Sequence, residues 1–133
     1  MGSNGMTKDI KLIIPCVPVA KPRMTRRDKW MLRPCVVRYR QFADIMRNGV
    51  GSLLPQNPES VSWRAFFPMP ESWSKKKKDV MRGKIHREKP DRDNLDKGIL
   101  DALWKDDKGI AIGSLVKLWD DGNGPRIELR IRE

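Results

Sequence analysis

Acidic residues gather in one stretch of this basic chain. Asp91 and Asp93 stand two residues apart, and Lys97 follows four residues after Asp93. Asp106 and Asp107 come about ten residues later. Carboxylate oxygens suit Mg²⁺, which commonly takes one or two of them and fills its remaining positions with water and phosphate. A lysine beside the ion would stabilise the charge on a scissile phosphate. The stretch therefore predicts metal-assisted hydrolysis of a phosphodiester.

Local structure is expected to place these side chains together. Pro90 disfavours a helical conformation before it, so the chain should enter the stretch extended. Side chains alternate along an extended segment, which would put Asp91 and Asp93 on the same side. A helix is expected over residues 94–104, with the lysine one turn beyond Asp93. The helix ends just before the two later acids, and one of them would fold back as the third carboxylate.

The same residues also have purely structural explanations. Asp93 could be the N-cap of the helix, with Asp96 completing a pair similar to a capping box. Lys97 could be a solvated partner of Asp93 or Asp101. The later pair of acids could be an ordinary turn. We favour a functional role because capping does not explain Asp91 and because the acids lie beside a strongly basic segment.

That basic segment is residues 75–89, where eight basic residues stand against two acidic ones. Its net charge of +6 is over half of the +11 carried by the 133-residue chain. Such an excess favours a polyanionic partner, because each phosphate contact releases counterions. We expect a flexible basic loop over about 71–89 that orders on DNA, with residues 21–29 as a second DNA-tracking loop. The expected DNA-binding residues are Lys75, Lys76, Lys77, Lys78, Arg82, Lys84, His86, Arg87, Lys89 and Arg92.

Hydrophobic periodicity predicts a single small domain of the α/β (α+β) class. The expected order is β-α-β-α-β-β, with two main helices and a mixed sheet of about four strands. The strands are expected within residues 10–19, 60–67, 110–119 and 126–132, and the helices at 36–48 and 94–104. A Gly-rich turn at 121–124 should join the last two strands as a hairpin.

Other features limit the class of protein. Residues 1–5 resemble the remnant of an expression tag, with Met6 as the native start and 6–133 as the domain. No apolar run is long enough to span a membrane, and nothing resembles a secretory signal. We therefore expect a cytoplasmic protein without a membrane partner or a small-molecule cofactor. Cys16 and Cys35 lack the spacing of a structural zinc site and are expected to be reduced thiols.

In combination, these motifs resemble the RusA family of Holliday-junction resolvases. The resemblance extends from the first strand to the last. It is carried by residues 70–78, by His86, by the Asp-x-Asp-Asn-x-x-Lys pattern of residues 91–97, by Leu-Asp-Ala-Leu at 100–103 and by the later Asp-Asp pair. Any one of these pieces alone would be weakly specific, whereas the set is specific.

The resemblance implies a homodimer that binds a four-way junction and nicks it symmetrically with Mg²⁺, or with Mn²⁺ as a substitute. It implies an active site of Asp91, Asp93, Lys97 and Asp107, in which the three aspartates hold the metal. The resemblance also implies a role in DNA recombination and repair. It further implies an origin in a phage or prophage of a bacterial host. Two other functions remain open: a non-catalytic DNA- or RNA-binding module, and a structure-selective nuclease without junction preference.

Overall fold

The computed structural model describes residues 9–29 and 31–133. The proposed tag remnant and Met6 lie outside the described residues. The elements follow the order β1 (Asp9–Pro15), η1 (Arg26–Lys29), α1 (Pro34–Val50), η2 (Gly51–Leu53), β2 (Ser60–Phe67), α2 (Lys75–Met81), α3 (Arg92–Leu103), β3 (Ile112–Trp119) and β4 (Arg126–Arg132). The expected α+β fold with a mixed four-stranded sheet is confirmed. No helix among the described residues is long and apolar enough to cross a membrane.

The strand order is β1-β4-β2-β3, so the expected hairpin of the last two strands is wrong. β4 is instead an interior strand, antiparallel to both β1 and β2. β3 pairs in parallel with β2 at the sheet edge. The apolar side chains of β4 explain its central position, because Ile127, Leu129 and Ile131 are all buried. Two glycines with positive φ, Gly122 and Gly124, help the chain turn away from β3.

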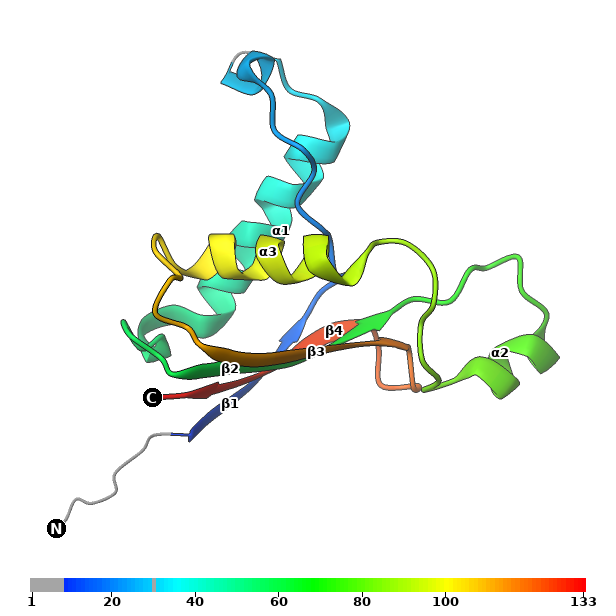
Figure 1. The fold of residues 1–133 in the computed structure, drawn as a ribbon. Helices are drawn as coiled ribbons and strands as arrows, with labels where there is room; N and C mark the ends of the chain where they lie inside the picture. The colour runs from blue at the N-terminus through cyan, green and yellow to red at the C-terminus, as the bar shows by residue number, and fades with distance from the viewer. Residues whose placement is uncertain (1–8, 30) are drawn as a thin grey trace, which may run out of the picture.

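Helices α1 and α3 both cover the same face of the sheet (Figure 1). Phe42 and Met46 of α1 and Leu95 and Ile99 of α3 are fully buried. They repeat every four residues, the spacing that gives a helix one apolar face. In β4 the buried residues alternate with exposed or half-buried charged ones, as expected for a sheet with one face against helices. The core therefore forms one layer between the sheet and these two helices.

The start of α1 and the chain before it project from the body as an arm, defined here as residues 21–29 and 31–40 (Figure 1). Asp28 organises the arm. It is 5% exposed, accepts a hydrogen bond from the Thr25 backbone N–H at 2.6 Å, and binds the Arg33 guanidinium at 2.8 Å. These bonds hold the pKa of Asp28 well below its usual value, with Arg33 as the largest cause. A segment expected to be a plain loop thus contains the short helix η1.

The expected flexible loop over 71–89 is also largely ordered. Ser74 caps α2, since its Oγ accepts a hydrogen bond from the Lys77 N–H at 3.1 Å. Beyond α2, Ile85 forms a β-bridge with Leu118. His86 packs between the rings of Phe67 and Trp119, with centroids 4.4 and 4.1 Å away. These contacts fix the basic segment to the edge of the sheet.

Candidate active site

The stretch that leads into α3 is held against β3. The Lys117 ammonium donates to the carbonyl oxygens of Glu88 and Pro90, the latter at 2.6 Å. Asp91 then takes the N-cap position in an extended conformation, but its side chain makes no capping hydrogen bond. The carboxylate of Asp91 is exposed. Capping therefore explains neither Asp91 nor Asp93, which lies inside the first turn.

The helix begins at Arg92, two residues earlier than expected, and this changes the geometry of the site. Asp91 is the extended N-cap residue, whereas Asp93 lies inside the first helical turn, so the alternation of an extended strand does not place them on the same side. Asp93 instead shares a face of the helix with Asp96, which lies about one turn further along. Asp91 lines a separate hollow with Lys89, Pro90 and Asn94, apart from the cavity that Asp93 and Asp96 line.

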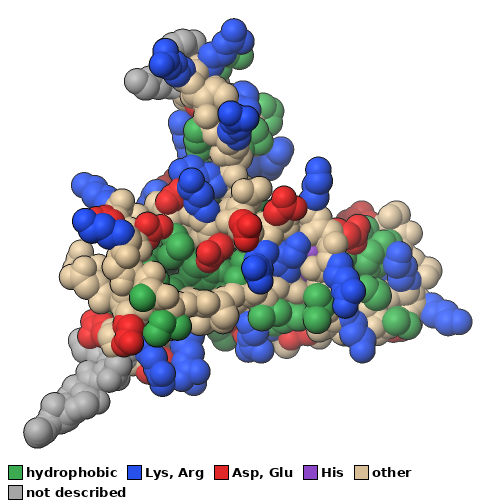
Figure 2. Space-filling view, in the orientation of Figure 1, with side chains coloured by type: hydrophobic (Ala, Val, Ile, Leu, Met, Phe, Trp, Pro, Cys, Tyr) green, Lys and Arg blue, Asp and Glu red, His purple; other side chains and the backbone are tan. Residues whose placement is uncertain are grey.

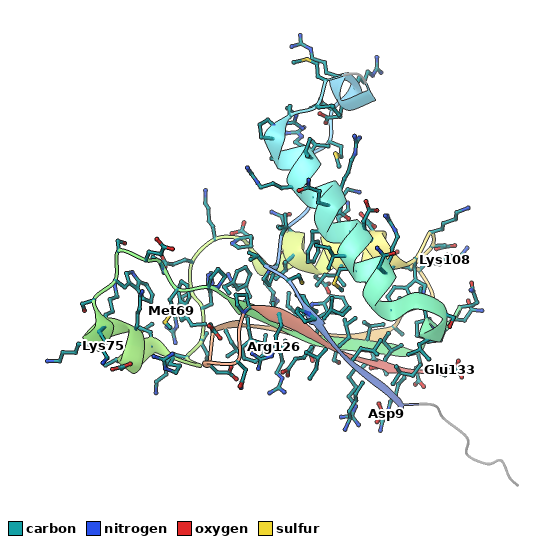
Figure 3. The ribbon with its side chains drawn as sticks, turned by 180° about the vertical axis from the view of Figure 1, so that it is seen from behind. Asp9, Met69, Lys75, Lys108, Arg126 and Glu133 are labelled. Atoms are coloured by element: carbon teal, nitrogen blue, oxygen red, sulfur yellow. The ribbon has the colours of Figure 1, made fainter. Side chains whose placement is uncertain are left out.

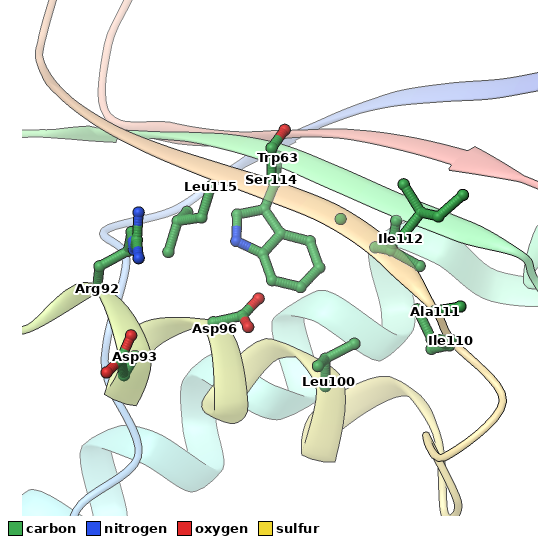
Figure 4. A pocket seen from close by; sticks show the side chains of 12 residues that line it. Trp63, Arg92, Asp93, Asp96, Leu100, Ile110, Ala111, Ile112, Ser114 and Leu115 are labelled. Carbon is green, nitrogen blue, oxygen red and sulfur yellow. The ribbon is translucent and has the colours of Figure 1, made fainter.

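Asp93 and Asp96 line a cavity of about 370 Å³ between α3 and the adjacent strands β2 and β3 (Figure 4). Its other walls include Trp63, Leu100 and Leu115. Burial raises the pKa of the Asp96 carboxyl, and the negative charges of Asp93 and Asp107 raise it further. Two other carboxylates thus act on Asp96. Sequence reasoning missed Asp96 as a site residue, although its spacing from Asp93 was the available signal.

Of the two later acids, Asp107 lies in the better position to act together with Asp96. Asp106 bonds to the Lys108 backbone N–H at 3.1 Å and lies 3.5 Å from the Lys108 ammonium. Asp107 is half-buried, and its charge reaches Asp96. However, α3 has 12 residues and is therefore about 18 Å long, with Asp91 at its start and Asp107 beyond its end. Among the described residues no three His, Cys, Asp or Glu side chains come together closely enough to hold a metal ion.

Lys97 lies on another side of α3. It is exposed and lines a groove with Asn94 and with arm residues that include Lys21 and Arg23. Lys21 is itself paired with Asp101 of α3 at 2.8 Å. The four expected catalytic residues therefore lie along one helix and its two ends, and the structure does not gather them in one cavity. Asp93 and Lys97 border neighbouring hollows on either side of the first turns of α3.

Basic side chains flank the acids on two sides. Figure 2 shows lysine and arginine on the arm and around α2, with acidic side chains over α3 between them. Lys75 and Lys108 mark opposite ends of the molecule in Figure 3, so α2 lies far from the turn that carries Asp107. Most of the residues expected to bind DNA are exposed, namely Lys75, Lys76, Lys77, Arg82, Lys84, Arg87, Lys89 and Arg92, and Lys78 is half-buried.

His86 is the exception to the expected DNA-binding set. It is 4% exposed and stacked between two core aromatic rings, so its ring cannot reach a base or a phosphate in this structure. Burial lowers the pKa of His86, and the nearby Lys117 lowers it further, which favours a neutral ring. Trp73 contacts Trp119 with centroids 4.8 Å apart. This contact anchors the start of the basic segment to β3.

Comparison with known proteins defines the class of this chain. A profile of a family of DNA-cutting enzymes, described as endodeoxyribonuclease RusA, matches residues 14–132. The chain belongs to the RusA family of endodeoxyribonucleases. The uncharacterized protein YqaN of Bacillus subtilis (strain 168) is 37% identical over 84 residues, which cover 57% of this chain and 58% of YqaN. The chain therefore matches less than two thirds of the length of this relative.

Proposed function

We propose that this protein is a divalent-cation-dependent endonuclease that resolves Holliday junctions and related branched DNA. The observation that carries the proposal is an acidic cavity between two basic projections, in a chain of the RusA family. The arm and α2 would bind phosphates on either side, since phosphate contacts position a protein on DNA. The carboxylates of α3 would then lie next to the strand to be cut.

The residues present fit a hydrated Mg²⁺ or Mn²⁺ ion. The negative charges of Asp93 and Asp107 both act on Asp96 in an otherwise basic molecule, and a cation would relieve that repulsion. Mg²⁺ does not require a closed protein cage, because it keeps several waters and binds substrate phosphate. We propose that Asp93 ligates the ion directly, and that Asp91 and Asp107, which the structure does not bring into the same cavity, act on it through its bound waters. A bound divalent cation supplies an activated water and neutralises charge on the phosphate.

The protein's own groups would do the remaining work. Lys97, on the neighbouring side of α3, would place its ammonium near the scissile phosphate. The N-terminus of α3 carries partial positive charge, which favours an anion there. Lys117 holds the backbone just before Asp91 in place, because its ammonium donates to the carbonyl oxygens of Glu88 and Pro90. Together these groups would orient the phosphate before the bond to it is broken.

Symmetric resolution requires two cuts in two strands. We propose a homodimer that supplies one active site for each cut. Sedimentation of the free protein and of its junction complex would measure this directly. Two protomers per junction are expected, and a single protomer that makes both cuts would contradict the proposal.

The substitution Asp93→Asn tests the function. It keeps the size of the side chain but removes a charged metal ligand, so junction cleavage should fall by about 100-fold or more while binding is retained. End-labelled four-way junctions, linear duplex and single strands would be compared in Mg²⁺ and in Mn²⁺. Asp44→Asn is the matched control, since Asp44 is exposed on α1 and pairs only with its neighbour Arg47.

Each alternative function predicts a different result in that assay. Paired nicks confined to the junction, and lost in the Asp93→Asn variant, support the proposal. Equal cutting of linear and branched substrates would indicate a structure-selective nuclease without junction preference. Junction binding without cutting in either metal would indicate a binding module. Full activity of the Asp93→Asn variant would rule out the assigned role of Asp93.

A further inference from the structure

The cavity next to the carboxylates has features that metal binding does not explain. Its volume of about 370 Å³ falls in the range of about 300–1,000 Å³ typical of small-ligand sites. Apolar side chains, including Leu100 and Leu115, form part of the wall (Figure 4). Charged groups stand at the α3 side, where Arg92 and Asp96 reach the cavity. A hollow of mixed chemistry of this kind suits an organic ligand better than a bare ion.

Trp63 points to a missing hydrogen-bond acceptor in this cavity. Its side chain is 3% exposed, and its indole N–H is a buried donor that has no partner among the described residues. Figure 4 shows the indole above Asp96, with its nitrogen turned toward the side of Arg92 and Leu115. A buried N–H without a partner is costly. By contrast, the Trp104 indole, also buried, donates to the Pro55 carbonyl at 2.9 Å.

Asp96 supplies an acceptor in the same cavity. Its carboxylate is half-buried and makes no hydrogen bond or ion pair with the described residues. Neither family resemblance nor helix capping assigns it a role, because the helix begins four residues earlier. The cavity therefore offers one buried N–H donor, one carboxylate acceptor and the donors of Arg92. A ligand that satisfies all three must carry both acceptors and donors on one edge.

The chemistry of these groups selects the class of ligand. A phosphate would be repelled by the adjacent carboxylates of Asp93 and Asp96. A metal ion would leave the Trp63 N–H unsatisfied, because an N–H cannot coordinate a cation. A neutral, planar group with apolar faces and a polar edge fits all the walls. In a nucleic-acid substrate, that description is met by an unpaired nucleobase.

We propose that this cavity accepts an unpaired nucleobase next to the nick. An N–H on the edge of the base would donate to Asp96, and a ring nitrogen or carbonyl beside it would accept from Trp63. Each of the four bases has such an edge, so the cavity would recognise the presence of an unpaired base. The proposal rests on the nuclease function above, because branch points are where a DNA duplex exposes unpaired bases. It makes Asp96 and Trp63 specificity-determining residues.

The test uses four-way junctions that carry either a normal nucleotide or an abasic one beside the nick. The wild-type protein should cut the normal junction at least about 10-fold faster than the abasic junction. In Asp96→Asn a neutral amide replaces the carboxylate and accepts a weaker hydrogen bond from the base, so this ratio should narrow to about 3-fold or less. Trp63→Phe removes the N–H and should also narrow the ratio. Asp44→Asn is the control and should keep the wild-type ratio.

Two outcomes in this assay would overturn the proposal. Equal cutting of the normal and the abasic junctions by the wild-type protein is one. An equal loss on both junctions in Asp96→Asn is the other, since it would indicate a purely metal-positioning or structural role. Thermal unfolding would show whether each variant is folded. If Trp63→Phe is unfolded, Asp96→Asn alone decides the question.

A binding experiment separates this inference from the nuclease function. The indole N–H resonance of Trp63 can be assigned in the ¹⁵N-labelled protein. A short single-stranded oligonucleotide should shift that resonance, whereas an abasic oligonucleotide of the same length should shift it less. If the protein cuts no DNA but the shift is seen, the proposed function fails and the base site stands. If the protein cuts junctions but neither oligonucleotide shifts the resonance, the base site is refuted.

Discussion

Replacing the four lysines of α2, Lys75 to Lys78, with alanine should reduce the salt dependence of junction binding. A helix turns by about 100° per residue, so four consecutive lysines point in four directions. The ammonium of Lys77 also lies over the Trp73 ring, 4.2 Å from its centroid. We therefore expect about two of the four to contact phosphates of one duplex. A flexible loop would instead allow all four to do so.

The size of the effect follows from the number of phosphates contacted. Each contact contributes about 0.9 to the slope of log K against log salt, so two contacts contribute about 1.8. Raising the salt fourfold, from about 50 to about 200 mM, should then weaken wild-type binding about 12-fold more than variant binding. Four contacts would make that factor about 150-fold.

Junction affinity should be measured by titration at several salt concentrations, in the absence of divalent metal so that the DNA stays intact. Lys11→Ala combined with Arg132→Ala is the control, because both residues are exposed on the sheet. An unchanged slope in the α2 variant would refute the assignment of α2 as a DNA contact. A reduction of the slope that corresponds to about four phosphate contacts would show that the segment leaves its helical form on DNA.

Two further predictions concern stability. The lowered pKa of His86 means that the unfolded chain binds its proton first, so the free energy of unfolding should fall as pH drops below the usual value of 6.5. The slope of the unfolding free energy against pH should not exceed about 1.4 kcal/mol per pH unit, and it should be smaller in His86→Phe. Urea unfolding at several pH values would measure both slopes, and equal slopes in the two proteins would contradict this prediction. Gly98→Ala should lower the unfolding temperature despite the better helix propensity of alanine, because a Cβ there would lie 3.0 Å from the Lys21 backbone N and 3.2 Å from the Tyr39 ring. Gly109→Ala, which meets nothing within 4 Å, should leave the unfolding temperature unchanged.

The elements could be predicted from sequence wherever the signal is local. The period-two patterns at 60–67 and 126–132 coincide with the bounds of β2 and β4. Strand pairing could not be predicted in the same way, because β4 pairs with β1 and β2 across at least the 60 residues that separate Phe66 from Arg126. A Gly-rich turn suggested a hairpin, but the apolar face of β4 is better buried in the middle of the sheet.

The site was predictable in its residue types and less so in its geometry. The motif identified the acids of α3. The helix begins at Arg92, however, so Asp91 and Asp93 line different hollows instead of the same side of an extended segment. Asp96 and Trp63 were missed because they meet only when α3 packs over β2, a contact without local signature. His86 was misassigned since charge in its neighbours gave no hint that its ring fills a space between Phe67 and Trp119.

The anchoring of the basic segment by His86 has a consequence for the thermodynamics of DNA binding. A segment that folds on its partner gives a large negative heat-capacity change and loses conformational entropy on association. Here Phe67, Trp73, His86 and Trp119 already bury the apolar surface that such folding would bury. Association through α2 should therefore show a heat capacity close to that of rigid docking. Its rate should be governed by long-range attraction between charges, with no slow ordering step.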